Sequence, residues 1–384
     1  MNMESFIRGS CESMCPKPEI ELRTREKLVH FYELKPTASG HSRSSPDPER
    51  MVKEFARSAA GMRQPRHWEL RTVRTLKRTV RFLLTEIIQD ERRPYSFRYE
   101  FVFDRLRAIR QELVMQNLGP EETLDILEPS VRFLAYSAYR LCECHISEFD
   151  PKICTTHVQE CLKKILRCYD DLDVLAKRYE RSRRVAMEGL YLMFNLGSTE
   201  AVLRGVNLPK EYRENLSLQL STSIEYLRGN FYRVLRNIER LPALEAAVAT
   251  LKLPDIRRQL LLHFSAAYAS KVLTVPLEWV GHVLHYPERD HPALLEDCQY
   301  YNLQLIGADD RPKNQSTVKT SSTKDNWWDE EDSFEERGGD ILGGMTVKFE
   351  RTRFDSSKPT KQPRRTECAD RKLGQVASLA EVLL

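Results

Sequence analysis

The sequence predicts an all-α protein in which a helical domain precedes a winged-helix module. Between about residues 49 and 270, apolar residues recur at three- and four-residue spacing in nearly every segment, as in amphipathic helices. Strand-like alternation is almost absent there and the connections are short, which favours packed helical pairs. Residues 271–306 then give the order helix, turn, helix, strand, which is typical of a winged helix or helix-turn-helix.

The first 48 residues are predicted to form an extended arm and linker. Prolines 16, 18, 36, 46 and 48 interrupt this stretch, and the run TASGHSRSSPDPE has linker composition. Helical periodicity begins at Pro48 or Glu49, where ERMVKEFARSAAG places Met51, Val52 and Phe55 on one stripe. We therefore expect the first helix over residues 49–61 and the helical domain over 49–270.

Longer amphipathic segments follow within this domain. Gly119-Pro120 ends one helix and opens the next, and Asp150-Pro151 is a further start signal. Helices are predicted over residues 67–89, 96–118, 121–144 and 150–172, and five shorter segments continue to residue 270.

The winged-helix module is predicted over residues 271–355. VPLEWVGHVLHY and DHPALLEDCQYYNL form its two short helices. LQLI is expected to pair with the alternating segment MTVKFERTRF as a small β-hairpin. The polar, low-complexity residues 307–344 between these strands are predicted to be a disordered acidic insert, and residues 356–384 a basic, disordered tail.

Composition places the chain among proteins of the cytoplasm or nucleus. Its 384 residues are 41% hydrophobic and 30% charged, with a net charge of +4. We find no apolar run long enough for a membrane helix and no apolar core of a signal peptide in MNMESFIRGS. The nine cysteines are therefore expected to be reduced, and no membrane association is predicted.

Sequence motifs give no support to an enzyme. The chain lacks the glycine-rich phosphate loops, the nucleophile elbow and the HExxH zinc motif. Cys11 and Cys15 have zinc-like spacing, but a structural site needs four ligands and no second pair follows nearby. His282 and His285, with His291 and Cys298 downstream, form the best remaining metal candidate; a solvent-exposed helix face and a buried cysteine are the simpler interpretation. We expect no catalytic residue, metal, cofactor or small-molecule substrate.

A cationic segment is the strongest candidate binding feature. Residues 57–110 contain fourteen arginine and lysine residues against six acidic ones, a local charge of +8. Arg71, Arg74, Arg78 and Arg81 have helical spacing along one stripe, which suits phosphate contacts or an acidic protein partner. A solvated helix face is the alternative interpretation. The predicted binding residues are Arg71, Arg74, Lys77, Arg78, Arg81, Arg105, Arg107 and Arg110.

An acidic and aromatic run, NWWDEEDSFEE at residues 326–336, has the opposite charge. Trp327 and Trp328 lie in a polar tract with no core to join. Such runs often act as docking motifs, so these tryptophans are predicted to contact a partner. Alternatively, the run folds back on the cationic stripe and shields it.

The N-terminal stretch GSCESMCPKPEIELR is predicted to be structural. Three residues separate its cysteines, which does not fit a redox Cys-x-x-Cys pair. Cys11 and Met14 are expected to pack under the helical core, Cys15-Pro16 to turn the chain, and Arg23 to bond to neighbouring helices.

Several strings together resemble the GANP family, the scaffold domain of the nuclear mRNA-export machinery. GSCESMCPKPEIELR, VKEFARSAAG and DRLRAIRQEL look like its first motif blocks, and RFLAYSAYRL and GNFYRVLRNIERLP like its later helices. SKVLTVPLEWVGHVLHYPERDHPALLEDCQYYNL resembles its winged-helix end. The likeness covers residues 9 to about 306 and 345–355. Leu106 and Glu112 depart from it, because the family usually has Thr and Asp there.

This resemblance implies a TPR-like or PCI-type helical solenoid capped by a winged helix, with no catalytic role. Family members hold a second PCI-type protein and a small acidic subunit, and their joined winged helices present a basic nucleic-acid surface. The chain looks most like the small stand-alone members, which lack the long extensions of large ones. Those members are linked to centrosome duplication, spindle assembly and mitotic progression. The resemblance therefore implies a scaffold at the centrosome and spindle with centrosomal partners, or an mRNA-export adaptor that binds RNA.

Overall fold

The computed structural model describes residues 6–35, 45–57, 63–175, 179–287, 291–307, 344–376 and 378–384. Within these residues the chain is predominantly helical, which confirms the predicted fold class. The chain divides into two compact units, each built from separate stretches of sequence. Unit 1 comprises residues 1–220, 241–251 and 364–384, and unit 2 comprises residues 221–240 and 252–363.

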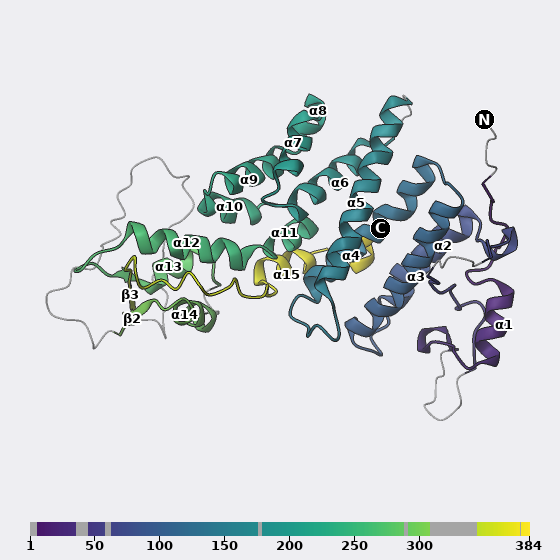
Figure 1. Ribbon diagram of the computed structural model, residues 1–384, viewed down its shortest axis with the longest axis horizontal. Coiled ribbons are helices and arrows are strands. Elements are labelled where there is room, and N and C mark those ends of the chain that lie inside the picture. Colours follow the sequence, from purple (N-terminus) through teal and green to yellow (C-terminus); the bar gives the residue numbers. More distant parts are fainter. Residues whose placement is uncertain are drawn as a thin grey trace. The chain divides into compact units, whose positions relative to one another are not determined.

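Unit 1 is a stack of helices in which α4 and α5 form the most extensive pair (Figure 1). Asp150 caps α5 by accepting hydrogen bonds from the amides of Lys152 and Ile153, as the Asp-Pro signal predicts. Its helices are α1 (Lys17–Arg25), α2 (Val73–Phe82), α3 (Tyr95–Met115), α4 (Pro120–Arg140), α5 (Pro151–Val174), α6 (Arg181–Phe194), α7 (Thr199–Asn207), α8 (Lys210–Asn215), α9 (Ser217–Leu227, whose last residues belong to unit 2), α11 (Ala243–Thr250), α15 (Glu367–Gly374) and α16 (Leu379–Leu383).

The core of unit 1 follows the apolar stripes read from the sequence. In α3, Phe101, Leu106, Ile109 and Leu113 are all buried. The buried apolar side of α2 continues into a π-helical turn at Leu83–Ile87, where Leu83 and Leu84 are both fully buried. Short 3-10 turns lie at Phe31–Glu33 and His67–Glu69.

Two expectations for the first 61 residues were wrong. The arm is not wholly extended, because α1 begins directly after Pro16. Residues 51–57, expected in a helix, are instead extended, although Met51 and Val52 are fully buried. Their amides donate to partners elsewhere in the chain, such as the Val52 amide to the Glu33 carboxylate at 3.0 Å. Because these tertiary partners satisfy the backbone, the local periodicity does not produce a helix.

Unit 2 contains the winged-helix order together with α10 (Phe231–Ile238) and α12 (Leu253–Ala267). The module consists of β1 (Val275–Pro276), α13 (Leu277–Val283), α14 (His291–Tyr300), β2 (Gln304–Ile306) and β3 (Thr346–Lys348). The predicted pairing is confirmed, with Leu305 opposite Val347 in an antiparallel ladder. β3 also pairs with β1, a strand the sequence analysis missed, so β3 is central.

Residues 356–384 were expected to form a basic tail. From residue 364 onward they instead belong to unit 1. Helix α15 packs against α11 and α4, where Ala369 joins Tyr139 and Ala247 in one buried cluster. The Tyr139 hydroxyl accepts from the Thr366 amide at 2.9 Å and donates to Asp370 at 3.0 Å. Two apolar residues, Ala369 and Leu373, and a capping threonine, Thr366, anchor this largely charged helix.

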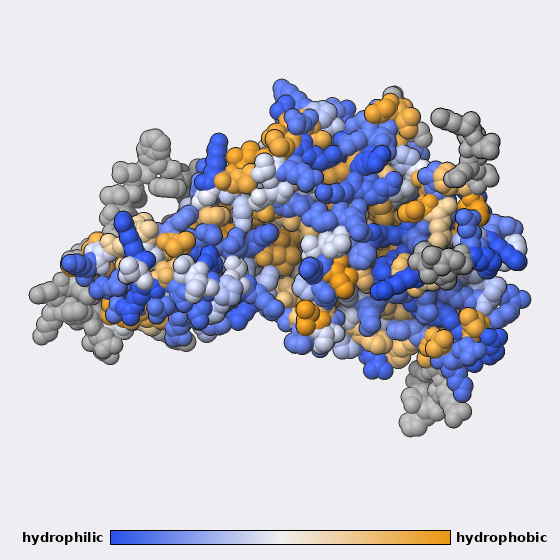
Figure 2. All heavy atoms as spheres, in the orientation of Figure 1, coloured by the Kyte–Doolittle hydropathy of each residue, from blue (hydrophilic) through white to orange (hydrophobic). Residues whose placement is uncertain are grey.

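The described surface is mostly hydrophilic, and on the face in Figure 2 apolar side chains lie in separate patches. No described helix is both long and apolar enough to cross a membrane.

Candidate partner-binding surface and the network that supports it

The N-terminal block is held by backbone contacts against the residues that directly precede α2. The Cys11 amide donates to Leu70 O at 2.9 Å, and the Thr72 amide donates back to Cys11 O at 3.0 Å. Met14 is 7% exposed and Cys15 fully buried, and Pro16 is the residue from which α1 begins. Burial raises the pKa of the Cys15 thiol. These side chains fill the core of unit 1 as inert groups.

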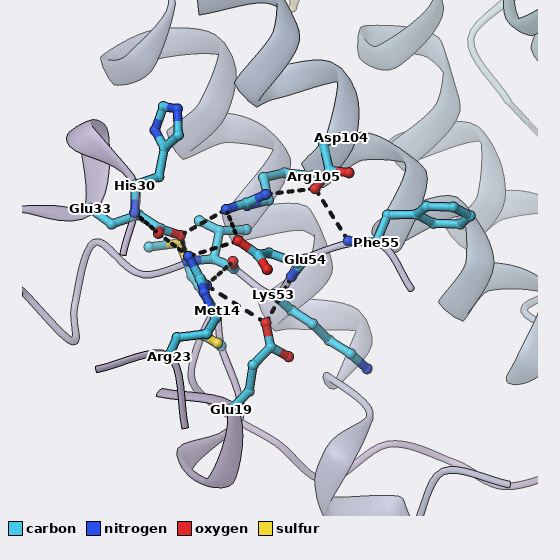
Figure 3. A network of polar contacts seen from close by, with 12 residues as sticks. Met14, Glu19, Arg23, His30, Glu33, Lys53, Glu54, Phe55, Asp104 and Arg105 are labelled. Carbon is cyan, nitrogen blue, oxygen red and sulfur yellow. Dashed lines mark hydrogen bonds and ion pairs between the residues drawn. The ribbon is translucent and has the colours of Figure 1, made fainter. Parts of the chain in front are cut away.

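A partly buried ionic cluster, here called the arm network, joins this block to α3 (Figure 3). It consists of Glu19, Arg23, Glu33, Glu54, Asp104 and Arg105.

Two nearly buried arginines converge on shared carboxylates in the arm network. Arg23 contacts Glu33 directly and lies 3.1 Å from Glu54. Arg105 lies 2.9 Å from Glu54 and 2.6 Å from Asp104. Charges are tolerated in such a place only when they are paired and hydrogen-bonded. Each arginine is therefore paired with at least two carboxylates, and the network is a structural element.

The arm network also fixes the extended segment 51–57. Glu19 accepts from the Glu54 amide at 2.9 Å, and Asp104 accepts from the Phe55 amide at 3.2 Å. Burial raises the pKa of Glu19. In Figure 3 the Phe55 ring points away from the carboxylates, on the far side of the cluster from His30. The network thus determines where the Phe55 side chain emerges.

Two of the predicted binding arginines are not on the surface. Arg71 is fully buried and Arg105 is 5% exposed. Arg71 Nε lies 3.1 Å from Glu112, which also accepts the Arg71 amide at 2.7 Å. Arg71 precedes Thr72, the N-cap of α2, and so is not part of its stripe. The helical spacing that suggested one stripe therefore included a residue outside the helix.

The remaining predicted residues of α2 do form a common surface, which we call the α2 patch: Arg74, Lys77, Arg78 and Arg81. With Glu12 and Thr75 they line a concavity of about 550 Å³. Lys77 pairs with Asp125 at 2.6 Å, and Arg78 donates to Glu12 O at 2.8 Å. Within the described parts of the chain, Arg74 and Arg81 have no ion-pair partner.

Arg107 and Arg110 lie on α3 and line a different hollow, between α3, α4 and α5. The Arg107 guanidinium carbon lies 3.8 Å from the Phe55 ring centroid. The Arg110 guanidinium contacts the His157 ring at 2.7 Å and donates to the Glu160 carboxylate at 2.8 Å. The eight predicted cations therefore separate into a buried pair, the α2 patch and this second hollow.

Sequence reasoning did not find the other residues of that hollow. Val114 and Lys164 contribute to it from α3 and α5. Their side chains come together only through the packing of the helices, so no local signal marks them. Trp327 and Trp328 lie outside the described residues.

No described group of three or more His, Cys, Asp or Glu side chains could hold a metal ion. Cys11 instead donates to Ser13 O at 3.3 Å. Burial raises the pKa of Cys142 to about 12, and of Cys144 to a smaller extent. Cys142 and Cys144 are therefore thiols at neutral pH.

Comparison with known proteins gives a consistent family match. A model of the SAC3/GANP family matches residues 14–307. The chain is 27% identical over 321 residues to Protein xmas of Drosophila melanogaster, a match that covers 79% of this chain and 15% of that protein. It is 25% identical over 311 residues to SAC3 family protein B of Arabidopsis thaliana, covering 76% of the chain and 17% of the relative.

A third relative is SAC3 family protein 1 of Schizosaccharomyces pombe, 24% identical over 322 residues, with coverage of 77% and 30%. The chain thus spans 15% to 30% of the length of the relatives it matches. The matches include α1 to α14 and therefore both units.

Proposed function

Because the chain belongs to the SAC3/GANP family, we propose that it is a non-enzymatic scaffold that binds protein and anionic partners. The observation that carries this proposal is the α2 patch, where Arg74 and Arg81 have no described counter-ion. Guanidinium groups on a rigid helix favour phosphate or carboxylate groups, with little sequence specificity. A surface of this kind can bind a partner without catalysing a reaction.

The scaffold role is tested by affinity purification of the tagged full chain. The double variant Arg74→Glu, Arg78→Glu brings the formal charge of the α2 patch from +4 to zero and should lose at least one partner that the unsubstituted chain retains. Lys17→Glu with Arg25→Glu is the matched control, because it makes the same charge change on exposed positions of α1. Identical partner sets in all three samples would show that the patch is only a solvated face.

In cells, we propose a role in centrosome duplication, spindle assembly and mitotic progression. The support is the resemblance of the motif blocks to the small centrosome-linked members of the family. Tagged protein at its normal level should concentrate at spindle poles in dividing cells, and its depletion should alter centrosome number. Staining confined to the nuclear envelope, with normal centrosomes after depletion, would count against this role.

A second candidate is an mRNA-export adaptor that binds RNA and a PCI-type protein with its small acidic subunit. The α2 patch favours it, since four cations on one face suit a phosphate backbone. If single-stranded RNA contacts all four, log K should fall with log salt with a slope of about −3. Arg74→Glu with Arg78→Glu should make that slope less steep by at least about 1.4. RNA that does not bind at low salt would eliminate this candidate.

The identity of co-purified proteins distinguishes the two roles. A PCI-type protein recovered in stoichiometric amount supports the export assembly, whereas centriolar proteins support the centrosomal role.

A further inference from the structure

A groove between α3, α4 and α5, here called the α3–α5 groove, combines an apolar floor with a cationic rim. It has a volume of about 470 Å³. Leu113, Leu118 and Leu127 are buried along it, while Val114 at its edge is 78% exposed. Such an exposed apolar side chain beside a hollow is typical of a docking site for a partner side chain.

The rim carries positive charge that the protein does not neutralise. Arg110 is balanced by Glu160 at 2.8 Å. In the described structure Arg107 and the exposed Lys164 have no carboxylate within ion-pair distance. Burial lowers the pKa of Arg107 and outweighs the opposing effect of the Asp104 carboxylate, while the Arg57 and Arg110 charges add to the lowering. A partly desolvated guanidinium without a counter-ion favours the approach of an external carboxylate.

One wall of the groove is held in place by the arm network. The Phe55 amide bonds to Asp104 at 3.2 Å, and Gln111 donates to Ala56 O at 2.9 Å. The Phe55 ring then stacks against Arg107 at 3.8 Å. Because these contacts fix both the ring and the guanidinium, little ordering is needed on binding.

We propose that the α3–α5 groove binds a short segment of an acidic partner protein. An apolar or aromatic side chain of the segment fills the groove beside Val114, and flanking carboxylates pair with Arg107 and Lys164. Apolar burial supplies the affinity and the charge pairs set the orientation. This inference rests on the proposed scaffold role and names the chemistry of one partner.

A protein segment fits the groove better than RNA does. Among the described residues that line the groove, two cations, Arg107 and Lys164, are without an ion-pair partner for phosphates, and the apolar floor would stay unfilled by a sugar-phosphate backbone. Bases bind single-strand sites by stacking on aromatic side chains, but here the Phe55 ring already stacks with Arg107.

The test measures binding of a fluorescein-labelled synthetic peptide, two tryptophans followed by four glutamates, to the full chain by fluorescence anisotropy at low salt. Lys164→Glu and Val114→Glu should each weaken binding by about tenfold or more, since both place a negative charge against the acidic peptide. Lys163→Glu is the matched control, because this neighbour on α5 pairs instead with Glu200 at 3.3 Å. It makes the same charge change and should alter affinity by less than about twofold. Circular dichroism checks that the exposed substitutions leave the fold intact.

Peptide chemistry and a second site complete the test. Peptides with alanine for tryptophan or glutamine for glutamate should bind more weakly than the parent. The proposal is overturned if Lys164→Glu and Val114→Glu bind like the unsubstituted chain, if Lys163→Glu loses as much affinity, or if polyuridylate displaces the peptide from the groove. Arg74→Glu with Arg78→Glu should retain peptide binding. If affinity purification still recovers a partner that depends on the α2 patch while the peptide fails to bind, only the groove assignment is wrong. If no such partner is recovered and the peptide also fails to bind, the scaffold role is wrong as well.

Discussion

The buried pair formed by Arg71 and Glu112 provides the sharpest test of how unit 1 is held together. Arg71 is fully buried and Glu112 is 1% exposed. The Glu112 carboxylate accepts the Arg71 amide at 2.7 Å, contacts the Arg71 guanidinium at 3.0 Å and lies 3.0 Å from Lys53. Glu112 lies on α3, so its contacts connect α3 both to the residues directly before α2 and to the extended segment 51–57.

Replacing Glu112 with Gln should be strongly destabilising. Gln keeps the size and still accepts the Arg71 amide, but it leaves a buried guanidinium without a counter-charge. Breaking a buried pair in this way costs about 3–5 kcal/mol of unfolding free energy. Arg71→Met should cost less, because Lys53 remains beside the carboxylate. The double variant Arg71→Met, Glu112→Gln removes both charges and should cost only about 1–2 kcal/mol.

The assay is urea denaturation of the four proteins followed by circular dichroism, with thermal melts as a second measurement. The double-mutant cycle should give a coupling of at least about 2 kcal/mol. Glu112→Gln should lower the Tm of unit 1 by on the order of 10 °C. Additive single effects, or a Glu112→Gln variant within about 1 kcal/mol of the unsubstituted chain, would refute the reasoning.

Three further predictions concern other parts of unit 1. Burial raises the pKa of Glu245 from 4.5 to about 7. The stability contributed by the protonated carboxyl is therefore complete below pH 4.5 and is lost as the pH rises to about 7. Thermal melts of Glu245→Gln should show a higher Tm than the unsubstituted chain at pH 8 and the same Tm at pH 4. Cys11→Ser with Cys15→Ser should cost about 1–3 kcal/mol in urea titrations, because hydroxyls replace buried thiols; stoichiometric zinc found by elemental analysis and lost in this variant would contradict the structural role. Gly9→Ala should loosen the arm, since its Cβ would lie 2.5 Å from Arg71 O and 2.6 Å from Leu70 O; faster hydrogen exchange at the Cys11 and Thr72 amides is the measurement, and unchanged protection would disprove it.

Local patterns were sufficient for the long helices. Helices α3, α4 and α5 satisfy their own backbone groups, so a 3.6-residue periodicity with start signals at Pro120 and Asp150 predicts them well. The pairing of β2 with β3 was also predictable, because the alternation of residues 345–354 requires a neighbouring strand.

Long-range polar contacts explain what the sequence did not reveal. The amide of Phe55 bonds to a carboxylate 49 residues away, and this contact outweighs a helical pattern over 51–57. Charge spacing identified the exposed α2 patch, yet it also included Arg71 and Arg105, whose counter-ions come from distant segments. The α3–α5 groove exists only where three helices meet, so a one-dimensional pattern cannot show it.

The return of residues 364–384 to unit 1 has a consequence during protein synthesis. Unit 1 needs α15 to cover Tyr139 and Ala247, yet more than a hundred residues separate α11 from α15 in the chain. At ribosomal elongation rates, the nascent chain waits on the order of ten seconds between the emergence of these two helices. Throughout that interval the Tyr139 hydroxyl lacks Thr366 and Asp370, its hydrogen-bond partners in the folded protein. Nascent unit 1 is thus a candidate substrate for co-translational chaperones.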